Sequence, residues 1–303
     1  MRELGVKCPY RAESSACPHP QGGTPMQLGI RIHDTLKMPI EERLPHIRSL
    51  GFTCGHLAPA MALYDRPVTD EALTPGYAMY LKKLFSQNNL DCAVLGCYLN
   101  LANPNKEQLE KTIHRYMTHI RFASILGCGV VGTETGAPNE TYSFVPECHS
   151  EEALNTFITN LRPVVEYAEK MGVIIGVEPV FSHIVYNPKR ARILLDAINS
   201  PNLQIILDPV NLLHISNYEK ANEIIDEAID LLGPDVAVVH IKDYKVENGR
   251  LISTGAGLGQ MDYTSLIRFM KDRKPHIHAT LEDTKPENNV QCREFIQKLY
   301  DEA

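Results

Sequence analysis

The stretch VIIGVEP at residues 173–179 is followed by PKRARILLDAI at 188–198 and by QIILDP at 204–209. The first and third stretches are short apolar runs typical of buried strands, and the middle one has the spacing of an amphipathic helix. A strand, a helix and a second strand in this order predict a parallel sheet, because parallel strands need a long crossover connection.

The same unit recurs from Met26 to the end of the chain, without a long linker that would divide it. Strands are predicted at 28–32, 53–57, 91–99, 129–133, 173–177, 204–207, 236–239 and 277–281. Helices are predicted at 40–50, 74–87, 106–126, 151–171, 188–198, 218–232, 262–272 and 288–300. Eight strands alternating with eight helices predict an α/β fold of the (β/α)₈ TIM barrel type, a single domain over residues 26–303.

An open dinucleotide-binding sheet is the main alternative for such a pattern. That fold places a glycine-rich loop after its first strand, where this chain has Ile32-His33-Asp34-Thr35. The closed barrel is therefore the favoured prediction.

Residues 1–25 differ from the rest, because prolines and glycines interrupt a polar segment without helical or strand periodicity. We expect an irregular N-terminal extension or arm. Cys8, Cys17 and His19 offer metal-ligating groups within it, but they lack the close pairing of a zinc site.

Composition narrows the class of protein. The 303 residues are 44% hydrophobic and 22% charged, and the formal net charge is −7 without a long basic run, which excludes nucleic acid and acidic membranes as expected partners. Eight cysteines without a C-x-x-C pair indicate reduced thiols. No stretch reaches the roughly 18 apolar residues of a membrane helix. We expect a cytoplasmic protein, as a monomer or a homo-oligomer.

Polar side chains occupy the predicted carboxyl end of every strand. In a TIM barrel these ends form the rim that carries the active site, so eight polar ends on one rim predict an enzyme. The residues concerned are His33 with Asp34, His56, Asn100, Glu134, Glu178, Asp208, His240, and Glu282 with Asp283.

The last four strands each place one acid or imidazole directly after an apolar run. Glu178, Asp208, His240 and Glu282 together offer three carboxylates and one imidazole, a set that suits a divalent cation such as Mn²⁺, Co²⁺ or Mg²⁺. Three carboxylates at one place would repel one another strongly without a cation. We therefore predict a metal site rather than an acidic pocket.

At these positions the chain resembles the sugar phosphate isomerase/epimerase family of the xylose isomerase-like TIM barrel superfamily, over about residues 26–303. The resemblance implies that Glu178, Asp208, His240 and Glu282 bind one divalent metal ion, with Mn²⁺ as the first choice and Co²⁺, Mg²⁺ or Zn²⁺ as alternatives. It also implies a carbohydrate substrate and a role in carbohydrate metabolism.

The chemistry follows from the parts of this site. A metal ion that binds both oxygens of an α-hydroxy carbonyl compound acidifies the carbon-bound hydrogen and stabilises the enediolate that forms on its removal. Glu178 and Glu282, on strands three steps apart, would approach the substrate from opposite sides as the catalytic acid and base. Epimerisation or aldose–ketose isomerisation results, depending on which carbon receives the proton.

Two positions depart from the pattern of ketose 3-epimerases. Asn211 stands where many of them have a histidine, and Lys242 and Lys245 stand where they have an arginine. His183 and His214 are candidates for the absent imidazole, so the sugar specificity stays open. The predicted substrate-binding residues are His33, His56, Glu134, His183, Asn211, His214 and Lys242.

Three other functions compete with this prediction. A lyase, similar to inosose dehydratases or C-glycoside-cleaving enzymes, would use the same enolate to expel a β-substituent. The second is DNA repair, because endonuclease IV resembles this chain in its order of strands and helices. A net charge of −7 and a ligand set with only one histidine argue against that function. The remaining alternative is a barrel that binds a sugar or a partner protein without catalysis, because fold alone does not decide function.

Overall fold

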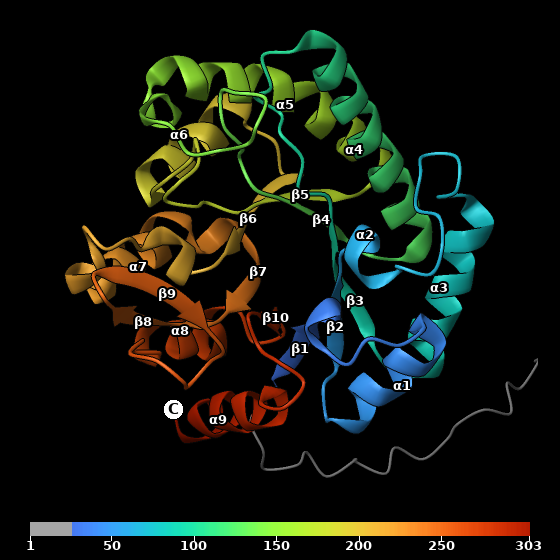
Figure 1. The fold of residues 1–303 in the computed structure, drawn as a ribbon, viewed down its shortest axis with the longest axis vertical. Coiled ribbons are helices and arrows are strands. Elements are labelled where there is room, and N and C mark those ends of the chain that lie inside the picture. The colour runs from blue at the N-terminus through green and yellow to red at the C-terminus, as the bar shows by residue number, and fades with distance from the viewer. Residues whose placement is uncertain (1–25) are drawn as a thin grey trace, which may run out of the picture.

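Eight parallel strands form a closed barrel at the centre of the molecule (Figure 1). The structure is a computed structural model that describes residues 26–303; the arm predicted for residues 1–25 lies outside this range. Around the barrel the strands follow the order β1-β10-β7-β6-β5-β4-β3-β2, and β1 pairs with both β10 and β2. The predicted TIM barrel is thus confirmed. Its strands are β1 (Gln27–Arg31), β2 (Cys54–Leu57), β3 (Asp91–Gly96), β4 (Val130–Thr133), β5 (Ile174–Val177), β6 (Leu203–Leu207), β7 (Val236–Ile241) and β10 (His278–Leu281).

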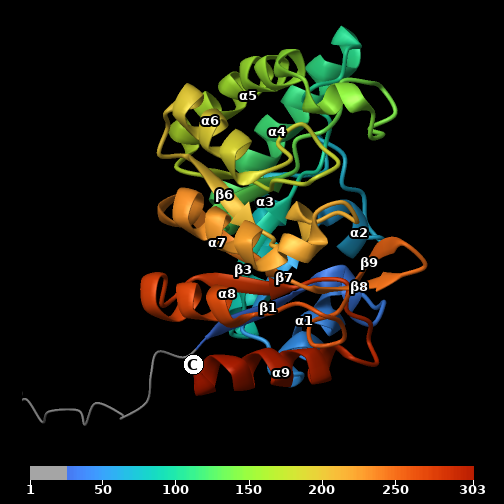
Figure 2. The ribbon, with the colours of Figure 1, turned by 90° about the vertical axis from the view of Figure 1, so that its left-hand side faces the viewer.

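Helices surround this barrel on the outside (Figures 1 and 2). Their bounds are α1 (Ile40–Ser49), α2 (Pro59–Ala62), α3 (Pro75–Gln87), α4 (Lys106–Leu126), α5 (Glu151–Met171), α6 (Pro188–Ile198), α7 (Ala221–Leu232), α8 (Thr264–Arg268) and α9 (Asn289–Glu302). The short helix α2 has no counterpart in the sequence prediction. Helix α8 is shorter than predicted, because a π-helical turn over Phe269–Arg273 continues it.

The ends of α4 show how closely local sequence sets these boundaries. The side chain of Asn105 accepts a hydrogen bond from the amide of Gln108 at 3.3 Å, which satisfies one of the unpaired donors of the first turn. Gly127 ends the helix in the left-handed conformation, with φ of +86°, which glycine adopts without steric cost.

The barrel interior is filled by side chains that alternate with glycines. A Cβ on Gly132 would lie 2.8 Å from Val94 Cγ1 and 2.9 Å from Ile206 Cδ1, and a Cβ on Gly176 would lie 2.9 Å from Ile206 Cγ1. The two glycines therefore leave the space that Ile206 occupies. The interior is a packed apolar layer rather than a pore, as in other TIM barrels. Its buried members are Cys54, Ala93, Val94, Val130, Ile206 and Val238.

A two-stranded antiparallel hairpin, β8 (Asp243–Glu247) and β9 (Arg250–Thr254), follows β7. Asn248 and Gly249 form its turn with φ of +51° and +72°, as the tight turns of hairpins require. The carboxylate of Asp243 accepts hydrogen bonds from the amides of Gly257 and Gly259 at 3.1 and 2.9 Å, which fixes the loop after the hairpin. In side view the hairpin and α2 project from the same end of the barrel (Figure 2).

Among residues 26–303, no helix is both long enough and apolar enough to cross a membrane.

Candidate metal centre

Four side chains meet at the carboxyl ends of consecutive barrel strands. Glu178 directly follows β5, Asp208 follows β6, Glu282 follows β10, and His240 lies near the end of β7. These strands are neighbours in the barrel, in the order β5, β6, β7 and β10. The structure therefore brings together the four residues that the sequence analysis selected as metal ligands.

Backbone hydrogen bonds tie two of these residues to the neighbouring strands. The amide of Glu178 donates to the carbonyl of Thr133 at the end of β4, at 2.8 Å, and the amide of Glu282 donates to the carbonyl of Ile241 at the end of β7, at 3.0 Å. The backbone at both residues thus continues the hydrogen-bonding pattern between neighbouring strands, so neither carboxylate is carried by an unpaired loop.

The spacing of the four side chains suits one shared ion. One candidate ligand atom from each lies within 4.8 Å of the other three, and ligands that bind one ion at about 2.0–2.6 Å are at most about 5 Å apart. His240 Nδ1 is 3.2 Å from Glu178 Oε1 and 3.3 Å from Glu282 Oε1. All four residues are buried, and even the most exposed, Glu282, is only 5% accessible.

The electrostatics of the group favour a positive charge at its centre. Burial by itself lowers the pKa of His240, but the carboxylates of Glu282 and Glu178 more than reverse this and raise the pKa to about 9. Burial raises the pKa of Asp208 to about 6, although Lys242 opposes the shift. A proton on His240 can supply the required charge, and the three carboxylates and one imidazole fit a divalent cation equally well.

Lys242 and Asn211 link two of the carboxylates. Lys242 Nζ lies 2.8 Å from Asp208 Oδ2 and donates a hydrogen bond to Asn211 Oδ1 at 2.8 Å. Asn211 Nδ2 donates to Glu178 Oε1 at 2.7 Å. Burial alone would lower the pKa of Lys242. The negative charges of Asp208, Glu282 and Glu178 raise this pKa by more, so the net shift is upward and the ammonium stays charged. We call this chain of contacts the Lys242–Asn211 link.

A cavity of about 150 Å³ opens beside the four side chains. It gives a small molecule access to two of the candidate ligands, Glu178 and Glu282, and to polar groups from the first four strand ends. Its wall consists of Arg31, His33, His56, Ala58, Met61, Tyr98, Glu134, Glu178 and Glu282.

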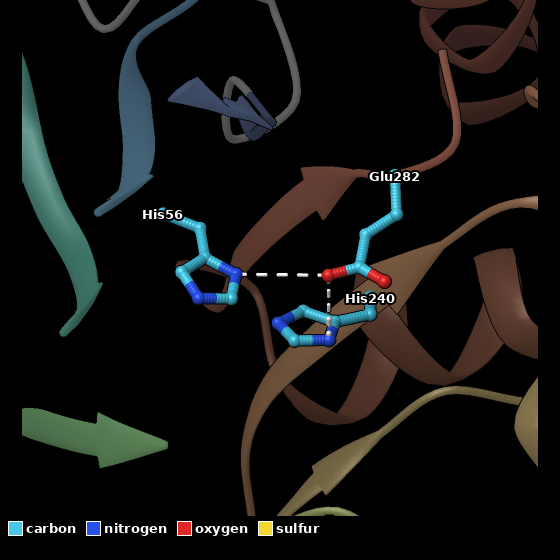
Figure 3. A group of neighbouring side chains, drawn as sticks. All are labelled: His56, His240 and Glu282. Carbon is cyan, nitrogen blue, oxygen red and sulfur yellow. Dashed lines mark ion pairs between the residues drawn. The ribbon is translucent and has the colours of Figure 1, made fainter. Parts of the chain in front are cut away.

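His56, on β2, adds a second imidazole beside Glu282 (Figure 3). Its Nδ1 is 3.6 Å from Glu282 Oε1, the same oxygen that faces His240. Its Nε2 is 3.2 Å from the hydroxyl of Tyr98, and its ring stacks on that of His240 with centroids 5.2 Å apart. Burial lowers the pKa of His56. The imidazole is therefore neutral, and a Nδ1 proton would point to Glu282.

Arg31 is a cavity residue that the sequence analysis missed. Its guanidinium pairs with Asp34 at 3.0 Å and with Asp283 at 2.8 Å, and it lies 3.5 Å from Glu282 Oε2. The sequence carries a signal for it, because Arg31 is a charged residue inside the otherwise apolar first strand. Tyr98, which lies inside the strand predicted at 91–99 but beyond the observed end of β3, and Tyr142, which lies in a loop, also contact predicted site residues and gave no comparable signal.

The other three histidines predicted to bind substrate differ in their position relative to the cavity. His33 lines the cavity, and burial and Arg31 lower its pKa to about 4. His183 lies with its Nδ1 3.6 Å from Glu134 Oε2. His214 is exposed and stacks on Phe181, with ring centroids 4.5 Å apart. It therefore lies at the outer rim rather than in the cavity wall.

A family model described as the xylose isomerase-like TIM barrel matches residues 44–299. The chain belongs to this family. No curated protein matches the sequence.

Solved structures of similar fold include two of the epimerase type and a dehydratase. 3-Keto-D-glucoside 4-epimerase from E. coli is 14% identical, with a TM-score of 0.70 over 90% of this chain and 99% of that one. A D-tagatose 3-epimerase-like protein is 19% identical, with a TM-score of 0.70 over 90% and 97%. A probable 3-DHS dehydratase from Bacillus anthracis is 16% identical, with a TM-score of 0.68 over 90% and 98%. At these identities the likeness establishes the fold alone.

Proposed function

We propose that the protein is a divalent-metal-dependent isomerase or epimerase that acts on a sugar or a sugar-like α-hydroxy carbonyl compound. The observation that carries this proposal is the buried group of Glu178, Asp208, His240 and Glu282 at the carboxyl end of the barrel, of which Glu178 and Glu282 form part of the wall of a small cavity. The epimerases among the structures of similar fold support a carbohydrate substrate.

The four residues of the group would hold the metal ion. Mn²⁺ remains our first choice, with Co²⁺, Mg²⁺ and Zn²⁺ as alternatives, because carboxylates with one imidazole accept all four. One structure of similar fold, from Mycobacterium smegmatis, is described in complex with magnesium. When bound, the ion would polarise the carbonyl and hydroxyl oxygens of the substrate.

The side chains of the cavity would carry the proton transfers. Glu178 and Glu282 come from strands separated by β6 and β7, so they approach the cavity from two sides. In our proposal one carboxylate removes a proton from the carbon next to the carbonyl, and the other returns a proton to the resulting enediolate. The Lys242–Asn211 link holds Glu178 in place through the hydrogen bond from Asn211, and His56 Nδ1 lies 3.6 Å from Glu282.

A lyase of the same family is the second candidate, since a dehydratase is among the structures of similar fold. Expulsion of a β-hydroxyl as water would follow from the same enolate. A barrel that binds a sugar or a partner without catalysis is the candidate from another class, and it would need no metal.

One experiment separates these candidates. The purified protein, loaded in turn with Mn²⁺, Co²⁺, Mg²⁺ and Zn²⁺, is incubated with a panel of ketoses, inososes and glycosides, and the products are analysed by mass spectrometry and NMR. Isomerisation or epimerisation conserves the mass of the substrate, whereas dehydration lowers it by one water. Asp208→Asn provides the control, because it weakens the ligand set without altering the cavity wall. Absence of metal binding would refute the proposal.

A further inference from the structure

Glu134 faces the cavity from the strand next to Glu178 but does not belong to the ligand group. It directly follows β4, the neighbour of β5, and it forms part of the cavity wall. Its side chain is 28% exposed, whereas that of Glu178 is 3% exposed. Among residues 26–303, the two groups close enough to share an ion contain Glu178, Asp208, His240, Glu282 and His56, and neither includes Glu134.

The hydroxyl of Tyr142 holds one oxygen of this carboxylate, and the ring of His183 lies beside it. The hydroxyl of Tyr142 donates a hydrogen bond to Glu134 Oε2 at 3.2 Å, and His183 Nδ1 lies 3.6 Å from the same oxygen. The rings of Tyr142 and His183 contact each other edge to face, with centroids 5.3 Å apart. Within the described part of the chain, no hydrogen bond reaches Oε1 of Glu134. One oxygen is thus fixed and the other is available to a molecule in the cavity.

The position of Tyr142 comes at a cost in backbone energy. Its φ is +57°, in the left-handed region that residues other than glycine, asparagine and aspartate rarely adopt. Such strain typically costs about 1–3 kcal/mol and persists where the surroundings enforce it, most often at functional sites. Here the strained residue provides the hydrogen bond that orients Glu134.

Resting on the proposed function, we infer that Glu134, in place of Glu178, is the second catalytic carboxylate beside Glu282. It exchanges a proton with the substrate on the Glu178 side of the cavity, while Glu178 serves as a ligand only. Tyr142 and His183 are its positioning residues. Glu178 is less suited to the transfer, because its Oε1 already accepts a hydrogen bond from Asn211 at 2.7 Å and lies 3.2 Å from His240 Nδ1.

The proton transfer is balanced within the site. The Glu134 carboxylate takes the proton from the substrate carbon next to the carbonyl, and the electron pair of that C–H bond moves toward the carbonyl oxygen to give the enediolate. In the second half of the reaction a proton returns to carbon, either from Glu134 or from Glu282 on the other side. No oxidant or co-reactant is needed.

The charges around Glu134 agree with such a role. Burial and the nearby Glu178 carboxylate raise its pKa to about 7, although Tyr142 and Lys242 oppose the shift. General acid–base groups work best when their pKa lies near the working pH. Burial lowers the pKa of His183 to about 4, so its imidazole is neutral and adds no competing charge.

The test compares Glu134→Gln with Glu140→Gln. Glu140 is an exposed carboxylate of the same loop, where it accepts a hydrogen bond from Asn105, so it is a matched control. Both variants and the wild type are loaded with Mn²⁺, and affinity is measured by calorimetry. Incorporation of solvent deuterium at carbon is then followed by NMR, starting separately from the substrate that the ketose panel identifies and from its product.

We expect E134Q to bind Mn²⁺ as tightly as the wild type and to lose deuterium incorporation from at least one of the two starting compounds by about 10²–10⁴-fold. E140Q should match the wild type in both measurements. Tyr142→Phe should keep the metal affinity and lower the exchange less than E134Q, since only the orientation of the carboxylate is lost.

Normal exchange by E134Q in a protein whose wild type is active would overturn this inference alone. Weakened metal binding by E134Q would overturn it too, because Glu134 would then act through the ligand group. A wild-type protein that binds metal but exchanges no hydrogen with any compound of the panel would overturn both this inference and the proposed function.

Discussion

Metal binding to this protein should displace one proton from His240. The neighbouring carboxylates raise the pKa of His240 to about 9, so the imidazole of the metal-free protein is protonated at neutral pH. A metal ion binds only the neutral imidazole, and the apparent association constant therefore falls tenfold for each pH unit below that pKa. At pH 7, two units below, the loss is about 100-fold or about 2.7 kcal/mol.

Calorimetric titration with Mn²⁺ between about pH 6.5 and 8.5, in buffers of different ionisation enthalpy, measures both the affinity and the number of protons released. We expect the logarithm of the association constant to rise with pH at a slope near one, and close to one proton to be released per ion at pH 7. At lower pH the slope should steepen, because the pKa of Asp208 is raised to about 6 and its carboxylate also takes up a proton.

His214→Gln is the control for this experiment, because His214 is exposed at the rim and should leave the slope unchanged. An affinity that does not vary over this range, with no proton released, would refute the reasoning. It would mean that His240 is already neutral in the metal-free protein or does not bind the ion.

Further outcomes are expected. Glu282→Gln should lose most of the turnover, by about 10²–10⁴-fold, with unchanged circular dichroism, since the amide cannot exchange a proton; near-normal turnover would show that this carboxylate is a ligand only. Glu178→Gln should also lose most of the turnover with unchanged circular dichroism, because the ligand group loses one of its three carboxylates; near-normal turnover would show that Glu178 is not needed in that group. Lys242→Met should destabilise the metal-free protein by about 3–5 kcal/mol in chemical unfolding, because Asp208 Oδ2 loses its buried partner; an unchanged midpoint would contradict this. The metal-free protein should lose stability as the pH rises from about 6.5 to about 9, since the folded state alone retains the His240 proton in that window; a melting temperature that rises over this window would show the opposite sign. Deletion of residues 1–25 should leave circular dichroism and metal content intact, and failure to fold would place the arm within the barrel.

The strands and the ligand group were predictable from sequence for one shared reason. Apolar runs such as 204–207 mark buried strands, and a parallel barrel brings all their carboxyl ends to one rim. Asp208 and Glu282, although 74 residues apart (282 − 208), therefore had to lie close together. No further information about packing was needed for that prediction.

Features that depend on loops were not predictable in the same way. The hairpin of β8 and β9 is the exception: it was predictable, because Asn248-Gly249 between alternating residues is a strong hairpin signal, but it was missed. The contact of Tyr142 with Glu134 arises from a loop whose path depends on its left-handed residue, which spacing along the chain does not reveal. Whether the side chain of Arg31 faces the cavity depends on the register of β1 against β2 and β10, which the sequence does not give.

The backbone bonds of Glu178 and Glu282 have a consequence for how this protein can diversify. Their amides donate to the carbonyls of Thr133 and Ile241, so the neighbouring strand holds the backbone of each residue whatever its side chain. The barrel ladder thus fixes where each side chain stands, and a substitution at either position can change the chemistry while the ladder is kept. The loop that carries Tyr142 and the hairpin that follows β7 hold none of the four ligands. Changes in the hairpin can therefore accumulate while the ligand group is kept, whereas changes at Tyr142 would alter the contact that orients Glu134.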